Sequence, residues 1–166
     1  MPRSAIGFDE VPMTDDHMEK LLDRASERAF AAYEENGRKM AALPRPLQIV
    51  VIIYSAQGII DNGGLQYFYE SDWPEQPPYS VFIEAYRAIG ALNVANCIEQ
   101  TAAMFPFPEP HLHQPRRDQF LTELDQGHEF HKYSDNSVGD ESVLDNLAEY
   151  VSAHLDEFKD ATGGGN

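Results

Sequence analysis

The chain has 166 residues, which is about the length of one domain. Its apolar content of 42% is enough to form a hydrophobic core, and its single cysteine, Cys97, excludes an internal disulfide framework and a zinc site built from several thiolates. The 28 acidic and 12 basic residues give a formal net charge of −16, which argues against direct binding to nucleic acids or to anionic lipid surfaces.

No apolar run approaches the ~18 residues expected of a membrane-spanning helix. The N-terminus, Met1-Pro2-Arg3-Ser4, also lacks the apolar stretch of a secretory signal. We therefore expect a cytoplasmic protein with no membrane partner.

The sequence predicts one helical domain over residues 14–160, between a flexible arm at 1–13 and a disordered tail at 161–166. In the first predicted helix, Thr14 is a good N-cap, and apolar residues then recur at helical spacing. Asn36-Gly37 is a typical helix stop.

Residues 47–60 permit two interpretations. The β-branched run at 49–53 favours a strand, and the following Asn62-Gly63 pair is a strong hairpin signal. The apolar stretch is nevertheless longer than most strands, and it fits a helix that is buried on all sides. The sequence alone leaves both interpretations open.

The signals further along the chain are helical. Ser80 is a candidate N-cap for a helix that stops at Gly90, and Asn93 is a candidate N-cap for the next one. A short helix is expected around Phe120, and Asp140 is the expected cap of the last long helix. The predicted inward face of that last helix comprises Val143, Leu144, Leu147, Val151, Leu155 and Phe158. We predict an all-α fold: a single compact domain of about six or seven helices.

One segment has an unusual composition. Its two glycines permit a tight reversal of the chain, and its apolar residues can pack back onto the preceding segment. We interpret it as mainly structural, a corner between helices, in which only Gln66 and Tyr67 have polar atoms available for a ligand. The motif consists of Asn62, Gly63, Gly64, Gln66, Tyr67 and Phe68.

The pattern Asn-Gly-Gly-x-Gln-Tyr-Phe at 62–68 resembles the hallmark of a bacterial family of small all-α proteins that includes a DNA-mimic protein. The usual form of that hallmark has one more residue before the glutamine. Residues 86–91 and 104–106 also resemble family segments, and the resemblance covers roughly residues 45–160. It implies a helical domain and, for the mimic member, a homodimer that presents carboxylates in place of phosphates to a DNA-binding regulator.

Acidic residues are concentrated in the last third of the chain. Residues 118–166 contain twelve acidic and two basic residues. Carboxylates four residues apart on a helix stand ~6 Å apart along its axis, whereas duplex DNA carries a charge every ~1.7 Å, so a mimic needs more than one such row. The predicted binding surface consists of Glu141, Asp145, Glu149, Asp156 and Glu157. The stripe of Glu141, Asp145 and Glu149 contains no lysine to relieve its repulsion, and only Lys132 and Lys159 offset the acidity of the last third of the chain.

We therefore interpret the chain as an acidic, non-enzymatic binding protein that occupies the DNA-binding surface of a basic protein such as a transcription regulator. The acidity could instead serve solubility or adaptation to high salt. An alternative is an enzyme, or an immunity-type or stress-related protein, with a pocket near Asn62, Gln66 and Tyr67. A third alternative is a domain that only mediates self-association.

The sequence indicates no catalytic residue, cofactor or metal site. His128 and His131 lie three residues apart around Glu129, which does not match the His-Glu-x-x-His pattern of zinc proteases. Cys97 lies on the apolar face of its predicted helix, where an inert, buried thiol is expected.

Overall fold

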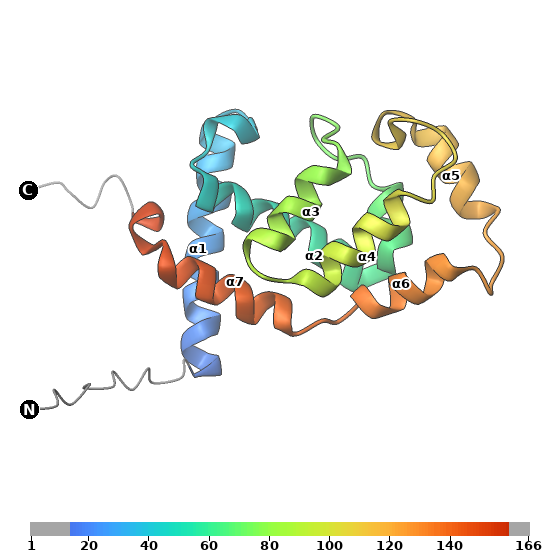
Figure 1. Ribbon diagram of the computed structural model, residues 1–166. Helices are drawn as coiled ribbons and strands as arrows, with labels where there is room; N and C mark the ends of the chain where they lie inside the picture. Colours follow the sequence, from blue (N-terminus) through green and yellow to red (C-terminus); the bar gives the residue numbers. More distant parts are fainter. Residues whose placement is uncertain (1–13, 160–166) are drawn as a thin grey trace, which may run out of the picture.

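The structure, a computed structural model, describes residues 14–159. Within this range it is all-α and contains no strand, so the predicted fold class is confirmed (Figure 1). The predicted arm at 1–13, the tail at 161–166 and residue 160 lie outside the described residues. The elements are α1 (Asp15–Glu35), η1 (Met40–Ala42), α2 (Arg45–Glu70), α3 (Tyr79–Ala88), α4 (Leu92–Ala102), η2 (Pro110–Leu112), α5 (Gln114–Thr122), α6 (Glu129–Ser137), α7 (Ser142–Ala153) and η3 (Leu155–Phe158).

Helix α2 is the centre of the core and settles the ambiguity of residues 47–60. It continues through the β-branched run up to Asn62, breaks at Gly63 and Gly64, and then resumes as a helix, so no hairpin forms there. Pro46 near its N-terminus suits the first turn of a helix, where a backbone donor is not needed. Ile49, Val50 and Ile53 are completely buried. Burial from several sides outweighs the local strand preference, because most helical stability in proteins comes from tertiary packing.

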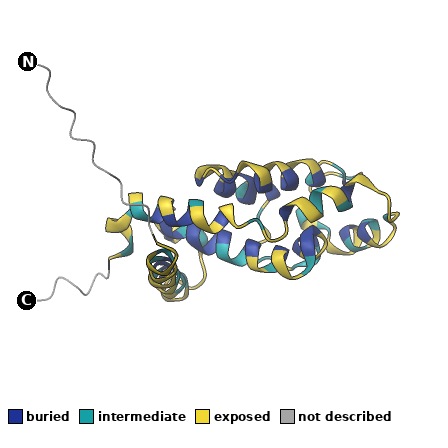
Figure 2. Ribbon diagram, turned by 90° about the horizontal axis from the view of Figure 1, so that it is seen from below, coloured by how far each residue is buried: buried dark blue, intermediate teal, exposed yellow. Residues whose placement is uncertain are grey.

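The other helices surround α2. Helix α1 stands at one end of the molecule, where it packs against α2 and is crossed by α7 (Figure 1). Helices α3 and α4 pack against each other, and α4 continues the contact onto α6. Figure 2 shows buried residues facing inward along each of these helices and exposed residues facing outward.

Several predicted helix ends are confirmed. The Thr14 hydroxyl accepts a hydrogen bond from the His17 amide at 3.3 Å, and α1 ends at Asn36. Gly90 follows α3 with a φ of 80°. Ser80, in contrast, lies in the first turn of α3, and Pro78 is its N-cap residue.

The predicted role of Asn93 is wrong. Ala91 is the N-cap residue of α4, and Asn93 lies in its first turn. The Asn93 amide instead donates to the Asn136 carbonyl at 3.0 Å and to the Asp140 carboxylate at 3.1 Å. The hydrogen-bond partners of Asn93 are therefore distant in the sequence, whereas the prediction of a helix cap considered only its neighbours.

Two features of the C-terminal part differ from expectation. Helix α6 was not predicted, because Phe130 is its only large buried apolar residue. In α7 the predicted inward face is partly wrong, since Leu144 is 43% exposed. Leu155, in η3, is 49% exposed.

Candidate functional site

The Asn-Gly-Gly motif is a break inside α2. Gly63 and Gly64 are the two residues of α2 with non-helical backbone angles, and Gly64 has φ 70° and ψ −167°. Only glycine adopts that combination readily. A Cβ at Gly64 would collide with the Ser134 hydroxyl, and a Cβ at Gly63 would collide with the Tyr67 ring. Gly64 is therefore required by its left-handed backbone and by the contact with Ser134, whereas the contact at Gly63 is with the exposed ring of Tyr67.

The break is tied to α6 and to the turn that follows it. The Leu65 amide, released from the helix by the break, donates to Ser134 Oγ at 2.9 Å. Asp61 Oδ1 accepts hydrogen bonds from the Gly139 amide at 2.8 Å and from Gln57 Nε2 at 2.7 Å. The contacts with Ser134 and Gly139 join residues 69 and 78 positions apart, so they fix α2 against the C-terminal part of the chain.

Aromatic side chains fill the space behind the break. Phe68 is completely buried, and its ring centroid lies 4.9 Å from that of Phe82 and 5.4 Å from that of Trp73. Tyr69 is also completely buried, and its hydroxyl donates to the Ile98 carbonyl at 3.0 Å. Burial raises the pKa of Tyr69, so its hydroxyl stays protonated. This part of the motif is core.

A buried arginine, which the sequence analysis missed, holds the end of α2. Arg117 is 3% exposed, and its Nε donates to the Tyr69 carbonyl at 2.9 Å. Its Nη1 donates to the carbonyls of Pro110 and His111 at 2.8 and 3.1 Å. A cation is favoured at a helix C-terminus, where carbonyls lack partners. Its neighbour Arg116 is exposed, so position in the sequence does not distinguish the two.

The polar members of the motif lie at the surface. Gln66 is exposed and donates to Glu70 Oε1 at 2.9 Å. Tyr67 is 53% exposed, and its ring covers Gly63. Asn62 and Tyr67 border an open hollow together with Ile59, Glu70 and Ser71. The hollow contains no nucleophile paired with a base.

The predicted acidic residues lie on α7 and η3. Glu141, Asp145 and Glu149 are all exposed, and we call these three residues the acidic row. Glu141 has helical backbone angles, φ −60° and ψ −25°, so the row keeps the four-residue spacing of the helix. Within residues 14–159 no ion pair involves any of the three carboxylates.

The two acidic residues of η3 differ from the row. Asp156 forms an ion pair with Lys159 at 2.7 Å, so Lys159 offsets part of this surface. The hydrogen bond and charge of Lys159 lower the pKa of Asp156. Glu157 is exposed and belongs to no ion pair in the described part of the chain. Of the five predicted carboxylates, only that of Asp156 therefore has an ion-pair partner among the described residues.

Cys97, the single cysteine of the chain, is buried. Burial raises the pKa of the Cys97 thiol, and the charge of Asp140 raises it further, so the reactive thiolate is disfavoured. Among residues 14–159, no three His, Cys, Asp or Glu side chains are placed to hold a metal ion. None of the described helices is both long enough and apolar enough to cross a membrane.

The sequence of the chain matches one known protein family. A family model described as "DMP19-like protein" matches residues 41–154. The chain belongs to the DMP19-like protein family. No curated protein and no solved structure matches it.

The DMP19-like region runs from η1 to the end of α7. It contains the glycine break, Arg117 and the acidic row. It excludes α1 and η3, so Asp156 and Glu157 lie outside the matched residues.

Proposed function

We propose that the protein is a non-enzymatic DNA mimic. In this proposal the carboxylates of α7 and η3 occupy the DNA-binding surface of a basic protein, such as a helix-turn-helix regulator, and so influence transcription. The observation that carries the proposal is the acidic row: three exposed carboxylates at regular spacing, with no ion pair among the described residues.

The energetics of the row support a binding role. Like charges four residues apart on a helix cost roughly 0.2–0.5 kcal/mol per pair, and Glu141, Asp145 and Glu149 form two such pairs. A basic partner would turn this repulsion into attraction. Leu144, exposed beside Asp145, offers an apolar contact within the same surface.

One row is too sparse to represent a duplex. Its carboxylates are ~6 Å apart along the helix axis, several times the ~1.7 Å charge spacing of DNA. The proposal therefore includes a homodimer, which would present a second row, and it places the protein in the cytoplasm with its regulator. Light scattering coupled to size-exclusion chromatography measures the oligomeric state, and a strict monomer would contradict the two-row arrangement.

The test is a capture experiment with matched variants. The row variant carries Glu141→Gln, Asp145→Asn and Glu149→Gln. The control variant carries Glu84→Gln, Glu109→Gln and Asp125→Asn, which removes the same charge from exposed positions elsewhere. Each protein is immobilised and exposed to host lysate at about 50 mM and about 300 mM salt, because electrostatic association weakens strongly over such a range.

We expect the wild type and the control variant to retain a basic DNA-binding protein at low salt, to lose it at high salt, and to release it when duplex DNA is added. The row variant should retain much less. Equal retention by the row variant, or retention insensitive to salt, would refute the proposal.

A further inference from the structure

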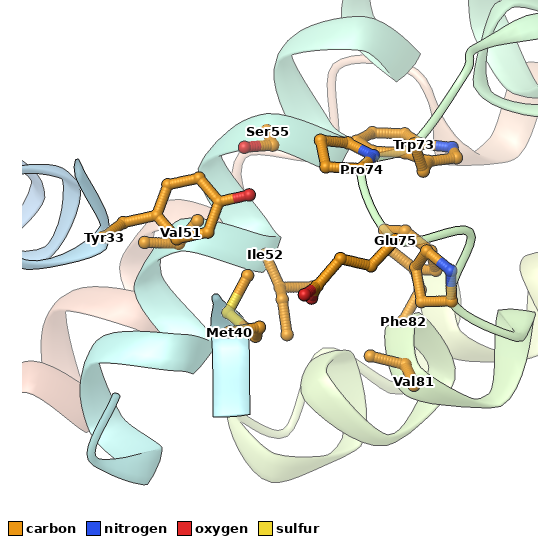
Figure 3. Close-up of a pocket in the computed structure, with 11 residues that line it drawn as sticks. Tyr33, Met40, Val51, Ile52, Ser55, Trp73, Pro74, Glu75, Val81 and Phe82 are labelled. Atoms are coloured by element: carbon orange, nitrogen blue, oxygen red, sulfur yellow. The ribbon is translucent and has the colours of Figure 1, made fainter. Parts of the chain in front are cut away.

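A second site lies between α1, η1, α2 and the loop before α3, where the structure has a cavity of about 130 Å³ (Figure 3). Tyr33 and Ser55 contribute hydroxyl groups to it. The rest of its wall is mainly apolar and includes Met40, Val51, Ile52, Trp73, Val81 and Phe82. For comparison, an apolar cavity of ~150 Å³ holds a benzene molecule, so this one suits a single small ring.

The loop before α3 places a carboxylate at this apolar wall. Glu75 and Gln76 have φ values of 65° and 46°, an uncommon left-handed conformation for residues with a side chain. The Gln76 amide donates to the Trp73 carbonyl at 3.0 Å and closes the turn. Figure 3 shows the Glu75 side chain reaching into the cavity toward Ile52.

The Glu75 charge is not neutralised within the described residues, since no ion pair there involves it. Burial raises the pKa of Tyr33, and the negative charge of Glu75 raises it further. The Glu75 charge therefore acts on a hydroxyl group that lines the cavity. Arg38 also acts on Tyr33, but its guanidinium is bound to the two Glu34 oxygens at 2.9 and 3.1 Å. The cavity thus combines an apolar wall with an exposed carboxylate at one side that forms no ion pair among the described residues.

We propose that this cavity binds a small organic cation, an ammonium group on a short arm attached to an apolar ring. The ammonium would pair with Glu75, and the ring would lie against Ile52 and Phe82. Such a ligand satisfies both halves of the site, because the ring gains apolar contact while the charge stays paired. The site uses no residue of the acidic row, so this inference is independent of the proposed DNA mimicry.

The test is a titration of the full chain followed by amide chemical shifts. The probe is phenethylamine, and 2-phenylethanol is its neutral counterpart of similar shape. A capped tripeptide with a central lysine represents the side chain of a docked protein. Two variants accompany the wild type: Glu75→Gln, and Glu84→Gln as an exposed control on α3.

We expect saturable shifts at the cavity residues with phenethylamine. The affinity should fall about fivefold in Glu75→Gln, the size expected for loss of a partly exposed ion pair, and stay unchanged in Glu84→Gln. Three results would overturn the proposal: no saturable binding of phenethylamine, equal affinity for the alcohol, or a preference for the lysine peptide, which would assign the site to protein docking.

Discussion

The glycine break of α2 and the acidic row of α7 differ in how strongly the rest of the protein constrains their side chains. At the break, close contacts dictate the residues: Gly64 lies against Ser134, and the Leu65 amide is bound to the Ser134 hydroxyl. The carboxylates of the row form no ion pair in the described part of the chain. A motif that is conspicuous in the sequence can therefore serve the fold, while an inconspicuous surface is free to serve a partner. Stability and binding should then be separable by mutation.

The largest expected effect is at the break. Gly64→Ala introduces a side chain where the backbone is left-handed and Ser134 is in the way, so we expect a loss of about 3 kcal/mol or more in the free energy of unfolding. Gly58→Ala is the matched control, because Gly58 lies in α2 with open space beside it and should gain about 0.5–1 kcal/mol. Urea denaturation measures both. Similar changes in the two variants would show that the break is not specifically constrained.

The next effect concerns the end of α2. Arg117→Met leaves the carbonyls of Tyr69, Pro110 and His111 without their donor, which we expect to cost about 2–3 kcal/mol. Arg116→Met is the control: its guanidinium lies 4.3 Å from the Phe107 ring centroid, a contact worth about 0.5–1 kcal/mol. Thermal unfolding of the pair compares them directly, and equal losses would contradict the buried role of Arg117.

A smaller, pH-dependent effect is expected just before α7. Burial alone would raise the pKa of Asp140, but hydrogen bonds from Ser142 and Asn93 outweigh it and lower the pKa below 3.8. The folded state therefore favours the ionised form, so this contribution is present above the unfolded pKa and is lost as the pH falls through the folded value.

The predicted cap position is wrong, because Glu141 is the N-cap residue of α7, but the Asp140 carboxylate accepts a hydrogen bond from the Ser142 amide at 3.1 Å. Asp140→Ala should accordingly cost about 1 kcal/mol at neutral pH and less below pH 3.8. Denaturation at several pH values measures the difference. Asp145→Ala provides the comparison, since the Asp145 carboxylate has no ion-pair partner among the described residues. A penalty at Asp140 that is the same at all pH values would contradict the assignment.

The smallest effect on stability is expected in the acidic row itself. Neutralising Glu141, Asp145 and Glu149 removes two repulsive pairs but also removes the favourable interaction of Glu141 and Asp145 with the N-terminus of α7, so the free energy of unfolding should change by less than about 0.5 kcal/mol. Urea denaturation of the row variant checks this. Clear destabilisation would mean that the row serves the fold, and the contrast with the glycine break would disappear.

The sequence predicted elements whose signals are local. Thr14 and Asn36 mark the two ends of α1 because capping depends only on the nearest turn of the helix. Residues 47–60 stayed ambiguous because their local preference is for a strand, and the burial that decides for a helix comes from distant residues. Helix α6 was missed because Phe130 is its only large buried apolar residue, which leaves no apolar helical pattern in the sequence.

The candidate site was predictable only in part. The four-residue spacing of the row could be read directly from Glu141, Asp145 and Glu149. The pairing of Asp156 with Lys159 and the burial of Arg117 beside an exposed Arg116 depend on side-chain placement that a one-dimensional pattern does not contain.

The most direct test of the central claim is a competition for the basic protein that the chain retains. That protein is bound to a fluorescent duplex, and the anisotropy of the duplex is followed as the chain is added. The account predicts that the wild type and the control variant displace the duplex, and that the row variant is weaker by about tenfold, because three exposed charge contacts are lost. If the duplex stays bound, or the row variant displaces it as well as the wild type does, the protein does not act as a DNA mimic through α7.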